Sequence, residues 1–236
     1  MVKTFPMVAG ATFGRHSHED HQLAWAARGV LTVHTDEATW VLPPTRALWI
    51  PAGVRHVTHA SGAATMRSVY LDPDRCPVEW AEPTPVGVGG LLAELIAHLG
   101  DAELDPARRI RAEGVLIDLL EPLHVAAIEL RMPHDPRALD VAAALVRDPS
   151  CRRTLGQWGR EVGASERTLA RAFHAETGVS FGRWRTQLRL QSALPTLAEG
   201  GSVASASDHA GYESPSAFVA AFRRETGMTP AEYFRV

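Results

Sequence analysis

Cysteine is scarce in this chain, and long apolar segments are missing. The two cysteines among the 236 residues, Cys76 and Cys151, lie far apart and form no CxxC pair, so a reducing cytoplasm is the simplest setting. No apolar run approaches the roughly 18 residues that a membrane span needs. The first residues also lack the basic and apolar segments of a signal peptide. We therefore expect a cytoplasmic protein that does not enter a membrane.

Lysine is almost absent, and the charge that arginine carries is unevenly distributed. Lys3 is the only lysine, and the net charge of the chain is −3. Residues 1–150 hold 13 basic and 19 acidic side chains, whereas residues 151–236 hold 11 basic and 8 acidic ones. The sign of the charge therefore reverses near residue 150. A basic half of this kind is suited to a polyanionic partner, and the acidic half is not.

A repeat near the C-terminus is the most informative feature. Residues 165–178 return 49 positions later as residues 214–227, with six identities: Ser165, Ala172, Phe173, Glu176, Thr177 and Gly178. Each copy begins with a serine suited to a helix N-cap and ends with a glycine suited to a left-handed C-terminal position. A turn glycine, Gly163 or Gly211, precedes each copy. A helix, a short glycine turn and a second capped helix form a helix-turn-helix, so the repeat predicts two such motifs in tandem.

The same region resembles the AraC/XylS family of bacterial transcription regulators. The residues that carry the resemblance are Thr154-Leu-x-x-Trp158, Ser165-x-Arg-Thr-Leu-x-Arg-x-Phe173, Glu176-Thr-Gly178, Phe181-x-x-Trp-Arg185, Arg189-Leu190, Leu197-Ala-x-Gly200, Gly211-Tyr-x-Ser-x-Ser-Ala-Phe218, Phe222-Arg-Arg224 and Gly227-x-Thr-Pro230. They lie within residues 154–230, without a large gap. The resemblance implies two helix-turn-helix subdomains joined by one long helix, here about 181–198, and promoter DNA as the partner.

Two recognition helices are expected, at 166–175 and 215–225. Helical spacing places Arg167, Ala170, Arg171 and His174 on the outer face of the first. Its two arginines suit the O6 and N7 atoms of guanine, although contact with phosphate alone is the alternative. The side chains on the outer face of the second helix are small and offer few hydrogen bonds, so we expect this helix to recognise DNA shape and thymine methyl groups. The predicted DNA-binding residues are Arg167, Arg171, His174, Ser216, Arg223 and Arg224, with the last two on phosphates.

Some residues of this half are unusual for the positions they occupy. Gly156 and Gly159 fall inside the first helix of the first motif, where each costs about 1 kcal/mol relative to alanine. Pro195 falls inside the long helix and is expected to kink it. The helix predicted at 203–210 is polar. These features predict reduced rigidity, mainly in the second motif.

The N-terminal half has the pattern of a β-structure followed by helices. Segments 31–35 and 38–42 are rich in β-branched and aromatic residues and flank a two-residue turn, and 66–71 is a further strand. Short strands of this kind indicate a small sandwich or barrel. Apolar residues then recur at helical spacing over 91–99 and 110–120, before Pro122. These two helices either cover the sheet or form a dimer interface.

Two short motifs in the β-region are similar to those of cupins. The first contains His16, His18 and Gln22, and the second, Pro51 to His56, has the Pro-x-Gly-x-x-His form. The resemblance implies a barrel in which His16, His18, Gln22 and His56 converge on one metal. In an extended strand His16 and His18 share a face. Three imidazoles suit nickel, zinc, copper or iron(II), and Gln22 stands where the family usually has a glutamate, which leaves the dication without a protein anion.

A metal-free arrangement is the alternative for these residues. The histidines would then form hydrogen bonds around a small-molecule pocket. Trp25, Trp40 and Trp49 are candidates for the lining of an effector pocket, or else they belong to the core. His21 falls on the opposite face of its strand and is expected to lie outside the site.

Together these patterns predict an α+β protein that is not an enzyme. The expected domains are a cupin sensor at 1–85, a helical dimerisation segment at 86–130 and a DNA-binding domain of the AraC type at 131–236. The predicted function is a homodimeric transcriptional regulator that senses a metal ion or small molecule. A cupin metalloenzyme of the dioxygenase kind, fused to a DNA-binding domain, is the alternative, and turnover of substrates by the metal-loaded protein would distinguish them. A metal store would leave the repeat unexplained.

Overall fold

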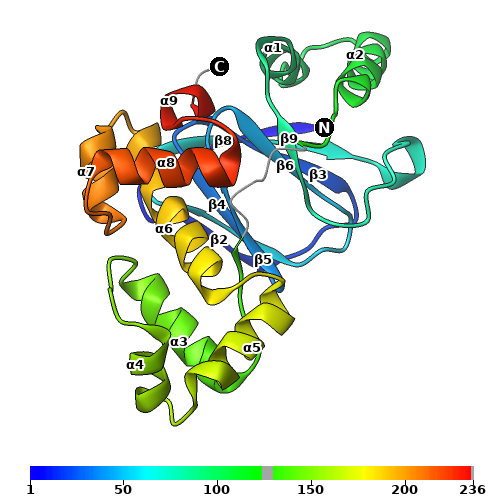
Figure 1. Ribbon diagram of the computed structural model, residues 1–236. Helices are drawn as coiled ribbons and strands as arrows, with labels where there is room; N and C mark the ends of the chain where they lie inside the picture. Colours follow the sequence, from blue (N-terminus) through cyan, green and yellow to red (C-terminus); the bar gives the residue numbers. More distant parts are fainter. Residues whose placement is uncertain (124–129, 235–236) are drawn as a thin grey trace. The chain divides into compact units, whose positions relative to one another are not determined.

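The computed structural model describes residues 1–123 and 130–234, and the chain divides into two compact units (Figure 1). The first unit comprises Met1–Asp36, Trp40–Ala127 and Ala231–Val236. The second comprises Glu37–Thr39 and Ile128–Pro230. Within the described residues, no helix combines the length and the apolar character needed to cross a membrane.

In the residues that the structure describes, the strands form two five-stranded sheets, and the paired strands are antiparallel. The order in the first sheet is β1 (Val2–Met7), β8 (Ala64–Leu71), β3 (His21–Arg28), β6 (Arg46–Ile50) and β9 (Thr84–Gly87). The order in the second is β10 (Leu130–Arg131), β5 (Ala38–Leu42), β4 (Leu31–Thr35), β7 (His56–Ala60) and β2 (Thr12–His16). A 3₁₀-helix, η1 (Pro73–Arg75), follows β8.

Alternation along β3 assigns its residues to two different environments. Leu23 pairs with Trp49 and Val69, and all three are buried in one hydrophobic core. That core also contains Leu92, Ile96 and Leu99 of α1 (Gly90–Leu99) and Leu116 of α2 (Pro106–Asp118). Because neighbouring residues of a strand point to opposite faces, Gln22 and Ala24 face away from these helices.

The two helices after the sheets bury only part of their apolar surface. In α1, Leu92, Ile96 and Leu99 are buried, whereas Leu91, predicted to share their face, is 66% exposed. In α2, Ile110 and Val115 are also exposed. The predicted boundary at residue 85 falls inside β9, and both helices share a core with the first sheet. Residues 124–129 of the predicted helical segment lie outside the described residues.

The second unit contains the predicted helical repeat. Its helices are α3 (Pro136–Arg147), α4 (Leu155–Glu161), α5 (Glu166–Thr177), α6 (Phe181–Ala198), α7 (Val203–His209) and α8 (Pro215–Thr226), followed by α9 (Pro230–Tyr233) at the boundary with the first unit. Leu169 and Phe173 of α5 pack with Trp184 of α6 and Val141 of α3 in one core. The predicted α+β class, with β-structure first and helices after it, is confirmed.

The two helical glycines of α4 have a packing role that the sequence did not indicate. A Cβ at Gly159 would lie 2.4 Å from the carbonyl oxygen of Ala164, in the turn before α5. A Cβ at Gly156 would lie 2.8 Å from a carboxylate oxygen of Glu166. These glycines therefore allow α4 to approach the turn and α5 closely, and this contact offsets their low helix propensity.

We expect Gly159→Ala to lower the free energy of unfolding by about 1–3 kcal/mol, because the new methyl group would overlap a backbone oxygen. Gly182→Ala is the matched control, since its Cβ in α6 would meet no atom within 4 Å. That change should raise stability by up to about 1 kcal/mol. Urea unfolding followed by circular dichroism measures both. Equal effects of the two substitutions would contradict this account of α4.

Candidate metal centre and nucleic-acid interface

Three histidines of the first unit converge, as the sequence predicted. The candidate ligand atoms of His16, His18 and His56 all lie within 4.8 Å of one another. The ring centres of His16 and His56 are 4.3 Å apart, and those of His18 and His56 are 5.2 Å apart. Imidazole nitrogens that share one metal at about 2.1 Å lie about 3–4 Å apart, so small side-chain rotations would bring these atoms to binding distance.

The strands place His16 and His56 side by side. His16 ends β2 and pairs in register with His56 at the start of β7. A shift in register between Phe13 and His16 marks a bulge, and bulges commonly redirect side chains near functional sites. His18 differs from the prediction, because β2 ends at His16 and His18 lies in the following loop rather than on the same strand face.

Each of the three imidazoles has one nitrogen held by the backbone. The Nδ1 atoms of His16, His18 and His56 lie 2.7, 2.6 and 3.0 Å from the carbonyl oxygens of residues 14, 20 and 54. A carbonyl oxygen only accepts, so each Nδ1 carries a proton and donates it. In a neutral ring this leaves the lone pair on Nε2, which is the arrangement that metal-binding histidines use.

Gln22 supplies a fourth group. Its amide nitrogen donates to Ser68 Oγ at 2.8 Å, which turns its Oε1 toward His18 Nε2 at 3.0 Å. With Nδ1 protonated, a neutral His18 presents a lone pair to another lone pair at this contact. A second ring proton, a cation shared by both atoms, or a rotated Gln22 amide that donates to His18 and accepts from Ser68 removes the conflict.

His56 is the most buried of the histidines. Its Nε2 has no hydrogen-bond partner among the described residues. Burial, and then the neighbouring charges of His16 and His18, lower the pKa of His56 to about 4 against the opposing effect of its bond to Val54. The imidazole is therefore neutral near pH 7, with an unshared pair directed into the cluster. These residues fit a divalent transition metal.

Two of the three tryptophans, Trp25 and Trp49, lie on the face of their sheet that is opposite the histidines. Trp25 and Trp49 belong to the core that contains α1 and α2. Because Gln22 faces the histidines and Trp25 is an odd number of residues away, the two side chains leave opposite faces of β3. Trp40 is buried on β5 of the second sheet. His21 contacts the ring of Trp49, with centres 4.8 Å apart, and so lies on the face of β3 that is opposite Gln22.

Tyr70 is a neighbour of the cluster that sequence reasoning missed. It pairs with Gln22 across β3 and β8, and its ring centre is 5.4 Å from that of His18. Burial raises the pKa of the Tyr70 hydroxyl. The spacing of Ser68 and Tyr70 on one face of a strand was the available signal, but only the register places them beside Gln22.

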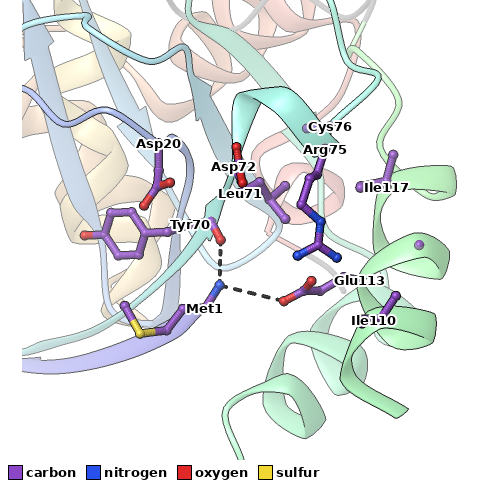
Figure 2. A pocket seen from close by; sticks show the side chains of 11 residues that line it. Met1, Asp20, Tyr70, Leu71, Asp72, Arg75, Cys76, Ile110, Glu113 and Ile117 are labelled. Carbon is purple, nitrogen blue, oxygen red and sulfur yellow. Dashed lines mark hydrogen bonds and ion pairs between the residues drawn. The ribbon is translucent and has the colours of Figure 1, made fainter. Parts of the chain in front are cut away.

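A separate cavity of about 400 Å³ lies between the end of β8 and α2 (Figure 2). Leu71, Ile110 and Ile117 form apolar walls, and Figure 2 shows Arg75 and Glu113 pointing into it from η1 and α2. The lining also includes Met1, Asp20, Tyr70, Asp72, Cys76 and Gly114. This volume falls in the range of small-molecule sites.

The second unit presents the two predicted recognition helices in equivalent ways. Ser165 and Ser214 cap α5 and α8 through their side chains, and Gly178 and Gly227 end them with φ of 75° and 76°. Gly163 forms the turn before the first, with φ of 67°. The sequence repeat is therefore a structural repeat.

The outer face of α5 carries free cationic side chains. Arg167, Arg171 and His174 are exposed, as predicted, and Leu169 and Phe173 are buried. Neither guanidinium forms a hydrogen bond or ion pair with the described part of the chain. Both remain available to the acceptors of a DNA groove.

The outer face of α8 is smaller and less polar. Pro215, Ser216, Val219, Ala220 and Arg223 line a shallow groove together with Thr229. Arg224 lies 3.8 Å from the carboxylate of Glu225. The predicted DNA-binding residues of both helices thus lie on exposed surface. Glu225 was not among the predicted DNA-binding residues, and the sequence did not indicate its contact with Arg224.

Comparison with known proteins supports both halves of this description. A family model described as an AraC-like ligand binding domain matches residues 4–120, and one described as a helix-turn-helix domain matches residues 158–235. The chain is 32% identical to the HTH-type transcriptional regulator NimR of Escherichia coli over 222 residues, which is 92% of this chain and 81% of that protein.

Two further relatives differ in how much of this chain they match. The HTH-type transcriptional regulator RipA of Corynebacterium glutamicum is 35% identical over 43% of this chain and 31% of its own length. The HTH-type transcriptional activator RhaR of Salmonella typhi is 24% identical over 94% of this chain and 86% of its own. Together with the tandem helix-turn-helix and the two-sheet domain, these matches show that the chain belongs to the AraC family of HTH-type transcriptional regulators, with an AraC-like ligand-binding domain ahead of its DNA-binding domain.

Proposed function

We propose that this regulator responds to a divalent transition metal held by His16, His18 and His56, with Gln22 as a weaker oxygen ligand. The observation that carries the proposal is the backbone bonding of the three imidazoles. Three separate carbonyl oxygens bind the three Nδ1 atoms, so the Nε2 atoms are the ones left for a cation.

The donor set narrows the choice of metal. Neutral imidazoles suit nickel, zinc, copper and iron(II), whereas magnesium and calcium prefer oxygen ligands. Gln22 carries no charge, so an anion or hydroxide from solution would balance the dication. When bound, the metal would supply positive charge and fixed coordination to a site that joins β2 and β7 of one sheet to β3 of the other.

Regulation rather than turnover is the role that we propose for the site. The relatives that cover most of this chain are transcription regulators. Ser68 donates to or accepts from Gln22 and Tyr70 packs on His18, and neither side chain is a carboxylate suited to general acid-base work. We further propose that the protein acts in the cytoplasm, where promoter DNA is found.

An organic effector is the second candidate. The cavity between β8 and α2 supports it, since its volume of about 400 Å³ suits a small molecule and its lining combines apolar walls with charged groups. Metal and organic ligand are distinguished by elemental analysis of the purified protein and by thermal shifts with each metal.

Replacing a histidine ligand should abolish metal binding, whereas replacing a neighbouring histidine outside the cluster should leave metal binding unchanged. We expect His18→Ala and His56→Ala to lose a metal that the unaltered chain binds at a ratio near 1:1, as measured by calorimetry and elemental analysis. His21→Ala is the matched control and should retain it, because His21 packs on Trp49. Gln22→Glu should tighten binding, since a carboxylate adds negative charge. Full metal content in a His16→Ala/His56→Ala double variant would refute the site.

The first recognition helix should contribute most of the sequence preference. Arg167→Ala or Arg171→Ala is expected to cost about 1–3 kcal/mol of DNA-binding free energy and to relax preference at one or two base positions. Arg223→Ala should weaken binding to all sequences alike, with a smaller dependence on salt. Binding assays against a library of single-base operator variants compare them. The assignment fails if both classes of variant change preference in the same way.

We propose that the chain forms a homodimer through α1 and α2. Leu91, Ile110 and Val115 are 66%, 53% and 48% exposed on these two helices, and apolar side chains exposed in such numbers favour a partner surface. Leu91→Glu and Ile110→Glu are therefore expected to shift the sedimentation coefficient toward that of a monomer. Leu139→Glu is the control, because Leu139 is an exposed apolar residue of the second unit. A monomeric unaltered chain at micromolar concentration would end this proposal.

A further inference from the structure

The two helix-turn-helix halves of the second unit are joined by more than the helix between them. Helix α6 has 18 residues, a length of about 27 Å, and connects the half that contains α5 to the half that contains α8. A helix joined to its neighbours only through flexible turns would leave the angle between α5 and α8 undetermined. Three contacts outside the chain connection link the halves directly.

The first contact is an ion pair between α6 and α8. Arg183 Nε donates to Glu225 Oε2 at 3.0 Å. Arg183 lies between Phe181 and Trp184, both of which are buried in the core of the first half. Glu225 is next to the last residue of the second recognition helix, and its side chain is only 9% exposed. The pair therefore connects α8 to the first half, with Glu225 nearly buried and the Arg183 side chain 53% exposed.

The second contact is a close approach of two backbone segments. Gly211, in the turn before α8, has φ of 73°, and a Cβ there would lie 2.5 Å from Cα of Ser150. Ser150 belongs to the segment that precedes α4. The turn of the second motif therefore rests directly on the first half, and only a glycine leaves room for this contact.

The third contact lies in the middle of α6. Arg189 donates from Nε to the carbonyl oxygen of Pro149 at 2.9 Å and from Nη2 to that of Cys151 at 3.1 Å. The same guanidinium lies 5.8 Å from the ring centre of Tyr212, which follows Gly211. One side chain of the connecting helix thus contacts both segments that meet at Gly211.

The repeated glutamate has different roles in the two halves. Glu176, the counterpart of Glu225, accepts from the backbone nitrogens of His134 and Asp135 at 2.6 and 2.9 Å, just before α3. It therefore fixes the end of α5 within its own half. Only Glu225 reaches across to the other half, so the sequence identity conceals a difference in function.

We propose that Glu225, Arg183 and Gly211 set the separation and rotation of the two recognition helices, so that this regulator recognises two DNA segments at one spacing. The partner is duplex DNA with two contacted segments on one face. One added base pair moves the second segment by about 3.4 Å and turns it by about 35°. A protein in which the angle between α5 and α8 is fixed cannot contact both segments after this change in spacing. A protein in which the two halves are loosely joined can.

The test uses the full-length chain and operators in which the spacer between the two protected segments is changed by one base pair either way. The unaltered protein should lose affinity by about tenfold on each change. Glu225→Arg and Arg183→Glu should reduce that loss to about threefold or less. Because both substitutions also change the charge near the DNA, the loss is taken as the ratio of affinities for the two spacings within each variant. The double variant that exchanges the two charges should restore the spacing preference, which a loss of folding would not allow.

Gly211→Ala and Gly163→Ala form a matched pair for the backbone contact. Both alanines would adopt positive φ, but a Cβ at Gly163 meets no atom within 4 Å. Gly211→Ala should lose the spacing preference and Gly163→Ala should keep it. Two results overturn the proposal: an unaltered protein without a spacing preference, and single charge variants that retain the preference of the unaltered protein.

Discussion

The alternation of side chains along β3 is the constraint on which the first unit depends. One face of the strand contributes Leu23 and Trp25 to the core with α1 and α2, and the other presents Gln22 to the histidines. A shift of one residue in the pairing of β3 would exchange these two sets. Core packing and the geometry of the candidate metal centre are therefore fixed by the same register, and neither can change without the other.

The second unit depends on a different constraint, the close approach of backbone segments at glycine residues. Gly159 allows α4 to contact the turn before α5, and Gly211 allows the second motif to contact the first. Both are places where the absence of a side chain determines how near two segments lie. These buried contacts fix the positions of α5 and α8. The exposed residues with which the two helices contact DNA are therefore positioned by the packing on their opposite faces.

The sequence predicted elements and residue types better than contacts between elements. The bounds of α5 and α8 followed from caps and apolar spacing, which are local signals, and those of α6 from the family resemblance. The convergence of His16, His18 and His56 was anticipated from a resemblance between motifs. The sequence left open whether Trp25 and Trp49 line a pocket or belong to the core, because a buried aromatic residue has the same local pattern on either face of a sheet. The ion pair of Glu225 with Arg183 could not be predicted from local sequence either, because the two residues are 42 positions apart.

The bulge in β2 has a consequence for the dynamics of the ligand-binding domain. Among the described strands, this one lies at the edge of its sheet with β7 as its neighbour, and the register shift next to His16 interrupts their ladder. Edge strands with few hydrogen bonds exchange their amide hydrogens through local fraying, at a free energy well below that of global unfolding. A ligand that joins His16 to His56 would suppress this fraying at the end of the strand where it begins. The sensor would then report occupancy as a change in local order, with little movement of the average backbone.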